Sequence, residues 1–395
     1  MSIYSYDVMV IGAGLGGATA ALALAIRGAR VAVFDVAQFP RHKVCGEFLS
    51  PEIFQTFARI GVDEAICDAQ PFPVKAARVY APGYSTSNER TTNTRTSNER
   101  TSSTRCLEIA LPQPGFGLSR FALDAILWRE MQARGVQTFD KTRVKNVTHD
   151  GDNFQLQSGD KTFSSRFVIN AAGRNARFLD AKSDVEYSIE KSKSPRYVGF
   201  KAHFSGVQNY DGAVELYAYD GGYCGVGAIE NGLANVCALA RYETVAGRSP
   251  DEFWRWQLNR SASLRARMQG ATRCFPWLAT ANVSFDRRAP LEDGVFNCGD
   301  SAGYIHPLTG NGMAMAARAG ELAAAIIASA LRGETSKTDA IELYARAWNR
   351  EFSSRLKWAT QLEKLLISAR LVNPALMVLG CAPRLAQRAF ASTRG

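Results

Sequence analysis

A cysteine and a glutamate stand two residues apart in a short segment that also carries three basic side chains. Residues 39–51 read FPRHKVCGEFLSP, with Cys45 and Glu47 directly after the basic residues at 41–43. Positive charge beside a cysteine favours its reactive thiolate form, and a carboxyl group removed from water can hold and deliver a proton. Cys45 and Glu47 are therefore candidate catalytic residues. The alternative for Cys45 is simple packing, because cysteine is one of the commonest buried residues.

The segment in front of them has the pattern of a dinucleotide-binding unit. Residues 6–35 run from an apolar strand through Gly12, Gly14 and Gly17 into a helix of small residues and a second apolar strand that ends at Asp35. In such a unit the first glycine allows the tight turn, the second lets the backbone approach a pyrophosphate and the third lets the helix pack closely on the strand. The helix start faces the phosphates, and the acid binds the ribose hydroxyls.

A second glycine-rich segment, residues 294–331, resembles the second FAD fingerprint of the para-hydroxybenzoate hydroxylase-like flavoproteins. It reads GVFNCGDSAGYIHPLTGNGM and continues into an alanine-rich helix. The resemblance implies that Gly299 and Asp300 hold the ribityl chain of FAD, and that Gly310, Gly312 and Met313 place a helix start at the flavin. Amides at a helix start stabilise the negative charge of reduced flavin.

Two basic residues join this set of expected cofactor contacts. Arg120, in LSRFALDAIL, matches the family segment whose arginine packs beside the flavin, and Arg41 is a plausible neighbour of the phosphates. The pair Gly173-Arg174 stands where hydroxylases of the group carry Asp-Gly, which weakens the case for a hydroxylase-type contact with a pyridine nucleotide. Since no second complete G-x-G-x-x-G unit follows a strand, NAD(P)H is expected to bind only transiently as electron donor, or another donor takes its place.

Within this superfamily, KVCGE resembles the K-x-C-G-D segment of geranylgeranyl reductases, and GDSAG agrees with the same branch. The resemblance implies that Cys45 lies near the flavin ring and that the reaction is hydride transfer to or from a carbon–carbon bond of an apolar small molecule. An FAD-dependent monooxygenase of an aromatic or polyketide-like substrate is the alternative enzyme. A flavin electron-transfer module without its own substrate is the alternative outside enzymes.

Residues 186–290 contain short β-rich runs separated at Gly221-Gly222 and at Asn231-Gly232, which predicts antiparallel hairpins laid over the flavin. Tyr217, Tyr219 and Tyr223 are candidate residues near a pocket. The segment YCGVGAIE lacks the tryptophans that reductases and halogenases of the superfamily carry there. The WRWQLN segment at 254–259 reads as a helix capped near Ser249, so the sequence argues against halogenation.

Composition and charge set the remaining expectations. The chain of 395 residues has 46% hydrophobic residues and a net charge of +10, typical of a globular protein, and its apolar stretches are shorter than a membrane span. The N-terminus has no signal-peptide pattern, so we expect a cytoplasmic protein. Eight scattered cysteines and four histidines do not suggest a metal site. The polar repeat at 86–105 lacks aromatic residues for stacking, so no nucleic-acid partner is expected.

The expected fold is α/β, with an FAD-binding Rossmann-like domain, an antiparallel β-sheet substrate domain and a helical C-terminus. The FAD-binding domain is predicted at 1–75, 106–185 and 291–335, and the substrate domain at 76–105 and 186–290, with a flexible polar insertion at 85–105. Helices are predicted at 336–395, broken at Asn373-Pro374 and packed on the substrate domain. Ten Lys and Arg against four Asp and Glu from Lys337 onward allow peripheral membrane contact or simply a solvated helix face.

Overall fold

The computed structural model describes residues 3–82, 106–174, 196–208, 210–283, 285, 288–303, 306–366 and 368–381. The predicted polar insertion at 85–105 lies entirely outside these ranges. The predicted domain boundary at 185/186 also falls on residues that are not described.

The first sheet is the predicted nucleotide-binding sheet. Its central strands are parallel, because the β-α-β connections return each strand in the same direction. The strand order is β16-β17-β9-β1-β2-β6, with the hairpin partner β8 on β9 and β7 on β8. These strands are β1 (Ile3–Ile11), β2 (Val31–Phe34), β6 (Gln137–Phe139), β7 (Val147–Asp150), β8 (Asn153–Ser158), β9 (Lys161–Asn170), β16 (Leu291–Glu292) and β17 (Val295–Asn297).

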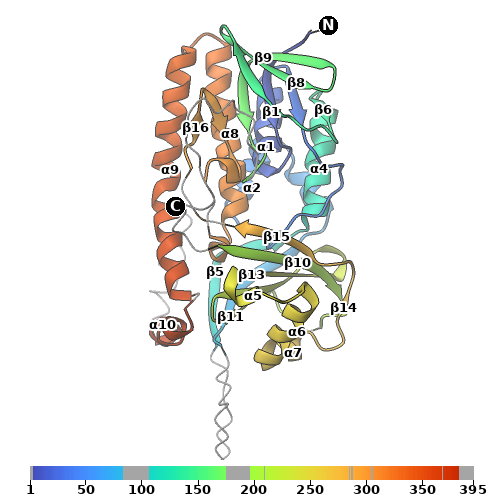
Figure 1. Cartoon of the computed structure of the whole chain (residues 1–395), viewed down its shortest axis with the longest axis vertical. Helices are drawn as coiled ribbons and strands as arrows, with labels where there is room; N and C mark the ends of the chain where they lie inside the picture. The colour runs from blue at the N-terminus through green and yellow to red at the C-terminus, as the bar shows by residue number, and fades with distance from the viewer. Residues whose placement is uncertain are drawn as a thin grey trace, which may run out of the picture.

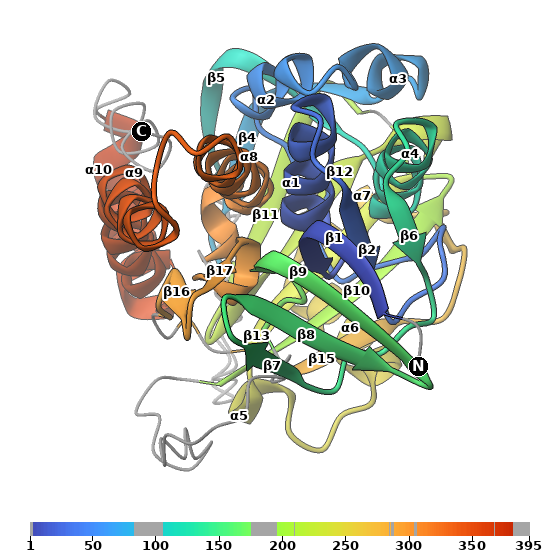
Figure 2. The ribbon, with the colours of Figure 1, turned by 90° about the horizontal axis from the view of Figure 1, so that it is seen from above.

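The helices of the two glycine-rich segments pack directly against each other. In α1 (Leu15–Ile26) and α8 (Gly312–Leu331), a Cβ atom added to Gly320 would lie 2.1 Å from the Gly16 carbonyl oxygen, and one added to Gly16 would lie 3.0 Å from the Ala316 carbonyl oxygen. Glycine at this crossing lets the two backbones touch. The two segments, almost 300 residues apart, are thereby held side by side (Figure 2).

The other helices of this part cover its sides. They are α2 (Ile53–Arg59), α3 (Asp63–Asp68) and α4 (Arg120–Ala133). Ser119 caps α4 by accepting a hydrogen bond from the Ala122 amide, 3.0 Å away. The Ser119 hydroxyl and amide in turn donate to the buried carboxylate of Glu230, which ties the start of α4 to the second sheet.

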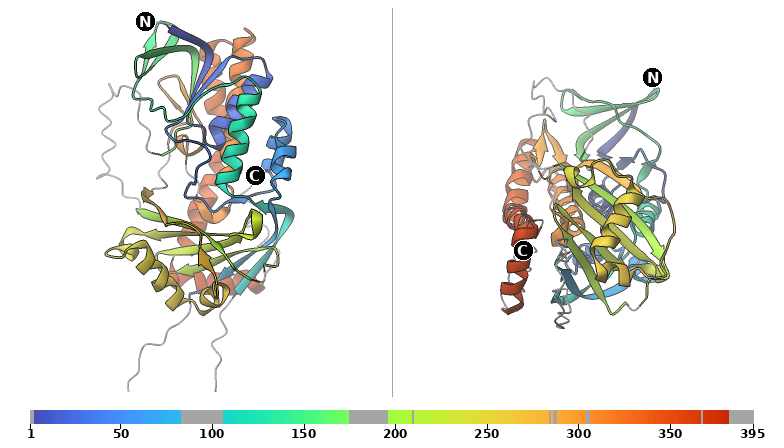
Figure 3. Two further views of the ribbon diagram at one scale, coloured as in Figure 1. Left: turned by 90° about the vertical axis from the view of Figure 1, so that its right-hand side faces the viewer. Right: turned by 60° about the horizontal axis from the view of Figure 1, so that its bottom comes forward.

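The second sheet forms a separate layer below the first, as Figures 1 and 3 show. Its order is β14-β10-β13-β12-β11-β4-β5-β3, with β15 paired to β10. The two predicted hairpins β11/β12 and β12/β13 are confirmed. The strands are β3 (Phe48–Leu49), β4 (Phe72–Tyr80), β5 (Cys106–Gly117), β10 (Tyr197–Ser205), β11 (Ala213–Tyr219), β12 (Gly222–Ala228), β13 (Ala234–Arg241), β14 (Thr272–Arg273) and β15 (Leu278–Val283).

Two details of this sheet were not predicted from the sequence. The sheet is not wholly antiparallel, since β11 pairs with β4 in parallel. The whole of β4 and β5 also belongs to it, so residues 72–75 and 106–117, which were assigned to the FAD-binding domain, lie with the substrate sheet. The pairing of β4 with β5 was predicted. The error arose because the glycine-rich motifs mark only the nucleotide-binding strands.

One face of the second sheet is covered by short helices: α5 (Tyr242–Val245), α6 (Pro250–Arg260) and α7 (Ala262–Arg267). The predicted cap of α6 is confirmed, with Ser249 and Glu252 forming a reciprocal capping box. Phe200, Phe253 and Trp256 belong to the apolar cluster under these helices. The opposite face of the sheet is therefore the one that faces the nucleotide-binding part.

The C-terminal helices differ from the prediction in two respects. The long helix α9 (Lys337–Leu366) packs along α8 and so lies with the nucleotide-binding part, whereas α10 (Ala369–Cys381) contacts β5 and β11 of the second sheet. Pro374 lies inside α10 instead of ending a helix. Contrary to the expectation from the sequence, one helix of the described residues, α8, is long and apolar enough to cross a membrane. Most of it is buried inside the protein, so it is weak evidence for a membrane span.

Candidate active site

A cavity of about 310 Å³ lies between the ends of the parallel strands and the free face of the second sheet. Both glycine-rich segments open into it, since Gly14 and Asp300 line the same cavity. Parallel strands of α/β sheets bind ligands at their carboxyl ends. Of the predicted site residues, those that line this cavity are Gly14, Cys45, Glu47, Arg120, Gly299, Asp300, Gly310, Gly312 and Met313.

The three loop glycines have different physical roles. Gly12 has φ of +99°, and a Cβ there would lie 2.4 Å from the Ala171 carbonyl oxygen. A Cβ on Gly17 would lie 1.9 Å from the Gly12 carbonyl oxygen, so this glycine is needed for helix packing. At Gly14, by contrast, a Cβ would meet only the ends of two guanidinium groups at 3.9 Å. Of the three glycines, Gly14 is therefore the one whose backbone faces open space.

These two guanidinium groups belong to Arg41 and Arg120. Arg120 is buried and makes paired hydrogen bonds of 2.7 and 2.8 Å to Asp124. Burial lowers its pKa, but the Asp124 carboxylate outweighs burial and holds the pKa above the usual value. Arg41 lies 3.4 Å from Asp35 and 3.5 Å from Asp124. Two positive groups thus converge where a pyrophosphate would approach Gly14.

Asp35 lies beside the cavity but is not part of its lining. Its carboxylate accepts hydrogen bonds from the amides of Ala13 and Ala37, each 2.8 Å long. This arrangement fixes the glycine loop to the end of β2. An acid at this place is also where the ribose of a dinucleotide would be recognised.

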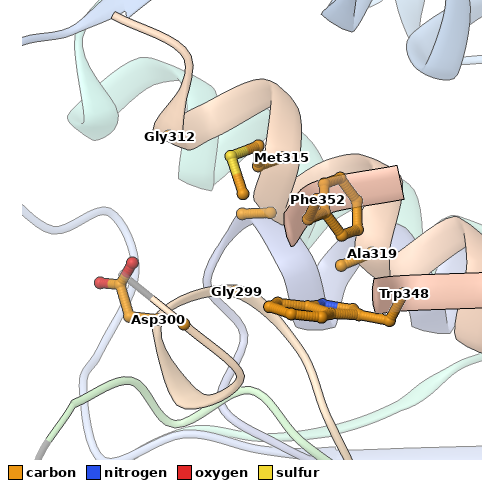
Figure 4. Close-up of a pocket in the computed structure, with 9 residues that line it drawn as sticks. Gly299, Asp300, Gly312, Met315, Ala319, Trp348 and Phe352 are labelled. Carbon is orange, nitrogen blue, oxygen red and sulfur yellow. The ribbon is translucent and has the colours of Figure 1, made fainter. Parts of the chain in front are cut away.

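The second segment approaches the cavity through two tight turns. Gly299 follows β17 with φ of +61°, and Gly310 has φ of +64° just before α8 begins. Figure 4 shows the Asp300 carboxylate pointing away from Trp348 and Phe352. Those two aromatic residues of α9 close a small hollow of about 30 Å³ behind Gly299. Burial lowers the pKa of the neighbouring Lys43, and the charge of Asp300 partly offsets this.

Cys45 lies between the two motifs. Its Sγ atom is 3.8 Å from Sδ of Met313 and accepts a hydrogen bond of 3.4 Å from the Glu47 amide. Cys45 and Met313, which are 268 residues apart, both line the cavity. The prediction that Cys45 faces the flavin position remains a prediction.

The contacts of Glu47 argue against the proton-donor role predicted for it. Its carboxylate is buried and receives hydrogen bonds from the Arg120 amide, from Lys201 and from His203. Burial alone would raise the pKa of Glu47, but the hydrogen bond from His203 and the charge of Lys201 outweigh it, and the pKa lies below its usual value. The carboxylate is therefore ionised and held in place.

Lys201 and His203 are site residues that the sequence reasoning missed. Both lie on β10 and face the cavity side, with Lys201 fully buried and also donating to the Lys43 carbonyl oxygen at 3.1 Å. Glu47 has φ of +56°, which is uncommon for a residue with a side chain. In the sequence, only the alternation of basic and apolar residues in KAHF (201–204) points to these two side chains. This pattern does not show that their partner is Glu47, about 150 residues earlier in the chain.

His306 is another buried group beside this site. Its Nδ1 accepts a weak hydrogen bond from the Leu308 amide at 3.4 Å, and Phe285, Tyr197 and Tyr223 surround the ring. Burial lowers the pKa of His306 from 6.5 to about 3. The imidazole is therefore neutral at physiological pH.

The wall of the cavity opposite the flavin motifs is the free face of the second sheet. Tyr223, Gly225, Gly227, Val214, Leu216 and Leu239 are among its lining residues. Of the three tyrosines predicted near a pocket, only Tyr223 lines it. Tyr217 and Tyr219 point to the opposite face, where Tyr217 donates to Glu215 and Tyr219 packs under α6. Alternation along β11 explains why Tyr217 and Tyr219 face away from the cavity.

The chain belongs to the FAD binding domain family, which matches residues 5–348. It is 25% identical over 369 residues to a tryptophan 2-halogenase from Chondromyces crocatus, covering 90% of this chain and 66% of that relative, slightly under two thirds of its length. A menaquinone reductase from Mycolicibacterium smegmatis is 46% identical over 56 residues, 14% of each chain. The crystal structure of a geranylgeranyl bacteriochlorophyll reductase-like protein from Thermoplasma acidophilum has the same fold, with TM-score 0.78, 18% identity and coverage of 99% and 96%.

The residues present fit FAD. Gly14 leaves the backbone open to a pyrophosphate, two guanidinium groups face that point, and the turn before α8 opens into the same cavity. The protein is thus an FAD-binding flavoprotein of the oxidoreductase superfamily that also contains halogenases and reductases.

Proposed function

We propose that this protein is an FAD-dependent oxidoreductase that transfers hydride to or from a carbon–carbon bond of an apolar small molecule. One observation carries the proposal: flavin-motif residues and an apolar sheet face line the same cavity. A substrate lying on the sheet would therefore face the flavin directly. Buried, largely apolar cavities are typical of small-molecule sites.

Bound FAD would supply the hydride chemistry, and Gly14, Arg41, Arg120 and Asp300 would hold it. The chain's own residues position the Cys45 thiol beside Met313. Cys45 is the proposed catalytic residue, as a proton-bearing group near the reacting carbon. Glu47, which Lys201 and His203 hold ionised, acts as a positioning residue for the segment that carries Cys45.

Halogenation is the second candidate, because the tryptophan 2-halogenase relative aligns with 90% of this chain. The sequence lacks the tryptophan motif of the halogenases, whereas the similarity to this relative keeps halogenation open as a candidate. Trp254 and Trp256 do lie on α6, under the outer face of the sheet, and not at the cavity. Monooxygenation and simple electron transfer complete the set of alternatives, with NAD(P)H as a proposed transient donor.

The mass of the product separates these reactions. FAD-loaded protein is reduced with NAD(P)H or dithionite and incubated with isoprenoid and polyketide compounds, with and without oxygen and with and without bromide. A reductase adds two hydrogens and works without oxygen. A monooxygenase adds an oxygen atom that carries the label from ¹⁸O₂, and a halogenase replaces hydrogen by bromine. Products that carry a new oxygen or bromine atom, with none that has gained or lost two hydrogens, would contradict the proposal.

A further inference from the structure

Helix α10 is apolar on two opposite faces, although it lies at the surface of the protein. Its sequence, ARLVNPALMVLGC, contains a single charged residue. Val372 and Leu376, one turn apart, are buried, whereas Met377 and Val378 are 50% and 59% exposed. A surface helix of a globular protein normally turns polar side chains outward. The outer face of α10, which we define as Met377 and Val378, is therefore apolar surface that an external partner can cover.

The inner face of α10 covers one end of the cavity wall. Val372 and Leu376 belong to one apolar cluster with Val79 and Leu107, and Leu216 packs against this cluster. Val79 is paired with Leu216 on one side and with Leu107 on the other, so the three side chains share one face of the sheet. Leu216 also lines the cavity. Helix α10 therefore lies between the apolar end of the cavity wall and the outside of the molecule.

Positive charge is concentrated in the same part of the chain. From Ser353 onward the sequence has seven Lys and Arg and one acidic residue, a surplus of +6. The end of α9, which contacts α10 and leads to it, carries the exposed Lys357 and, next to it, Trp358 with 53% exposure (Figure 1). Exposed apolar and tryptophan side chains beside basic residues are typical of segments that lie in the interface of an anionic membrane.

The size of this surface favours a membrane over a protein partner. A stable protein interface uses about 20–30 residues on each side, whereas the large exposed apolar residues here are Trp358, Met377 and Val378. A bilayer requires no matching shape. It gains affinity from a few inserted side chains and from each basic residue that lies near its negative surface.

We propose that the outer face of α10 and the adjoining end of α9 form a docking surface for an anionic lipid bilayer. Met377, Val378 and Trp358 enter the headgroup region, and Lys357 lies at the level of the lipid phosphates. This orientation turns the apolar end of the cavity wall toward the lipid, so that an apolar substrate reaches the cavity from the bilayer and not through water. Only this last consequence rests on the proposed function, because docking itself involves no flavin chemistry.

The test measures binding to lipid vesicles without turnover. FAD-loaded full-length protein is mixed with vesicles of phosphatidylcholine alone or of equal parts phosphatidylcholine and phosphatidylglycerol, and the bound fraction is measured by flotation. We expect at least about tenfold tighter binding to the anionic vesicles, because several basic residues each contribute to the attraction. Binding should weaken as salt is added, since exposed charges are screened.

Two variants separate the apolar contribution from the charge. The double variant Met377→Ser, Val378→Ser should bind anionic vesicles about tenfold more weakly, because the inserted apolar area is lost. Lys357→Gln should bind them about fivefold more weakly and should not change the binding to neutral vesicles. Ile26→Ser, at the end of α1, is the matched control, because its side chain is 51% exposed, and it should bind as the wild type does. All of these variants should retain FAD.

Wild-type protein that does not bind anionic vesicles, or that binds neutral vesicles equally well, overturns the proposal. Unchanged binding in the double variant Met377→Ser, Val378→Ser also overturns it. So does a dimer that forms without lipid in sedimentation experiments and is lost in this variant, because a second copy of the chain would then cover the outer face of α10. Failure of the proposed function appears separately, as loss of FAD binding or of any redox product.

Discussion

At the scale of single residues, similar motif glycines serve different ends. Gly17 is needed because its hydrogen faces the Gly12 carbonyl oxygen, whereas Gly14 faces open space bounded by two guanidinium groups. The first supports the fold and the second leaves room for the cofactor. This distinction cannot be read from the G-x-G-x-x-G spacing, in which all three positions look alike.

The difference can be measured with a pair of alanine variants. Gly17→Ala should lower the free energy of unfolding by about 3 kcal/mol or prevent folding, because the added Cβ overlaps backbone. Gly14→Ala should leave the stability of the FAD-free protein within about 0.5 kcal/mol of wild type and weaken FAD binding at least tenfold. Urea unfolding and FAD titration give the two quantities. Equal loss of stability in both variants would show that the distinction is wrong.

A single histidine should make the protein sensitive to mild acid. The pKa of His306 in the folded protein is about 3, below its ordinary value of 6.5, so the unfolded chain takes up this proton first as pH falls. Its contribution to stability is complete above pH 6.5 and is lost progressively toward pH 3. From pH 7 to pH 5 the loss is about 2 kcal/mol.

The variant His306→Asn tests this, since asparagine can still accept the hydrogen bond from the Leu308 amide. The difference in unfolding free energy between pH 7 and pH 5 should be about 2 kcal/mol smaller in the variant than in the wild type. The same pH dependence in both proteins would assign the acid sensitivity to other groups.

At the scale of elements, the side chains of Glu47, Lys201 and His203 form a cluster, the Glu47 cluster, which joins three secondary-structure elements. The carboxylate binds Lys201 and His203 of β10 and the first amide of α4, while its own backbone leads into β3. A strand of one sheet and a helix of the other domain therefore meet at one ionised side chain. The segment that carries Cys45 is positioned by this contact.

Removing the charge of Lys201 alone should lower the stability of the protein much more than removing the charges of both Lys201 and Glu47. Lys201→Met leaves a buried carboxylate without its cation and should cost about 3–5 kcal/mol of unfolding free energy. The double variant Glu47→Gln, Lys201→Met should recover at least half of that loss, because no unpaired charge remains. Denaturant unfolding of the wild type, both single variants and the double variant completes the cycle. Additive losses would mean that the two side chains do not interact.

At the scale of the whole molecule, the cofactor site draws on distant parts of the chain. The glycine loop lies near the N-terminus, Arg120 on α4, and Asp300 and Gly312 lie before and in α8. The contact of α1 with α8 through Gly16 and Gly320 brings these parts together. A ligand in this cavity links them further.

FAD should therefore stabilise the entire fold. At a free FAD concentration one hundred times its dissociation constant, the free energy of unfolding should rise by about 2.7 kcal/mol. Chemical unfolding at increasing FAD concentration measures this. In Gly14→Ala the same concentration of FAD should have a smaller effect, whereas no effect of FAD on the wild type would contradict the assigned cofactor site.

What the sequence determined by itself is local. The spacing of Gly12, Gly14 and Gly17, the apolar strand before Asp35 and the turn before Gly312 follow from short-range backbone geometry, and they predict the parallel sheet and an FAD site. The hairpins around Asn231 and the cap at Ser249 were predictable for the same reason. Each depends on a few neighbouring residues.

The tertiary structure decided everything that depends on partners far apart in the chain. Lys201 and His203 became site residues only because β10 places them against Glu47, and the role of Glu47 changed from proton donor to ionised anchor for the same reason. Which tyrosine faces the cavity depends on sheet register, and the place of α9 depends on its packing against α8. Burial and charge pairing are properties of the folded molecule, and no local pattern contains them.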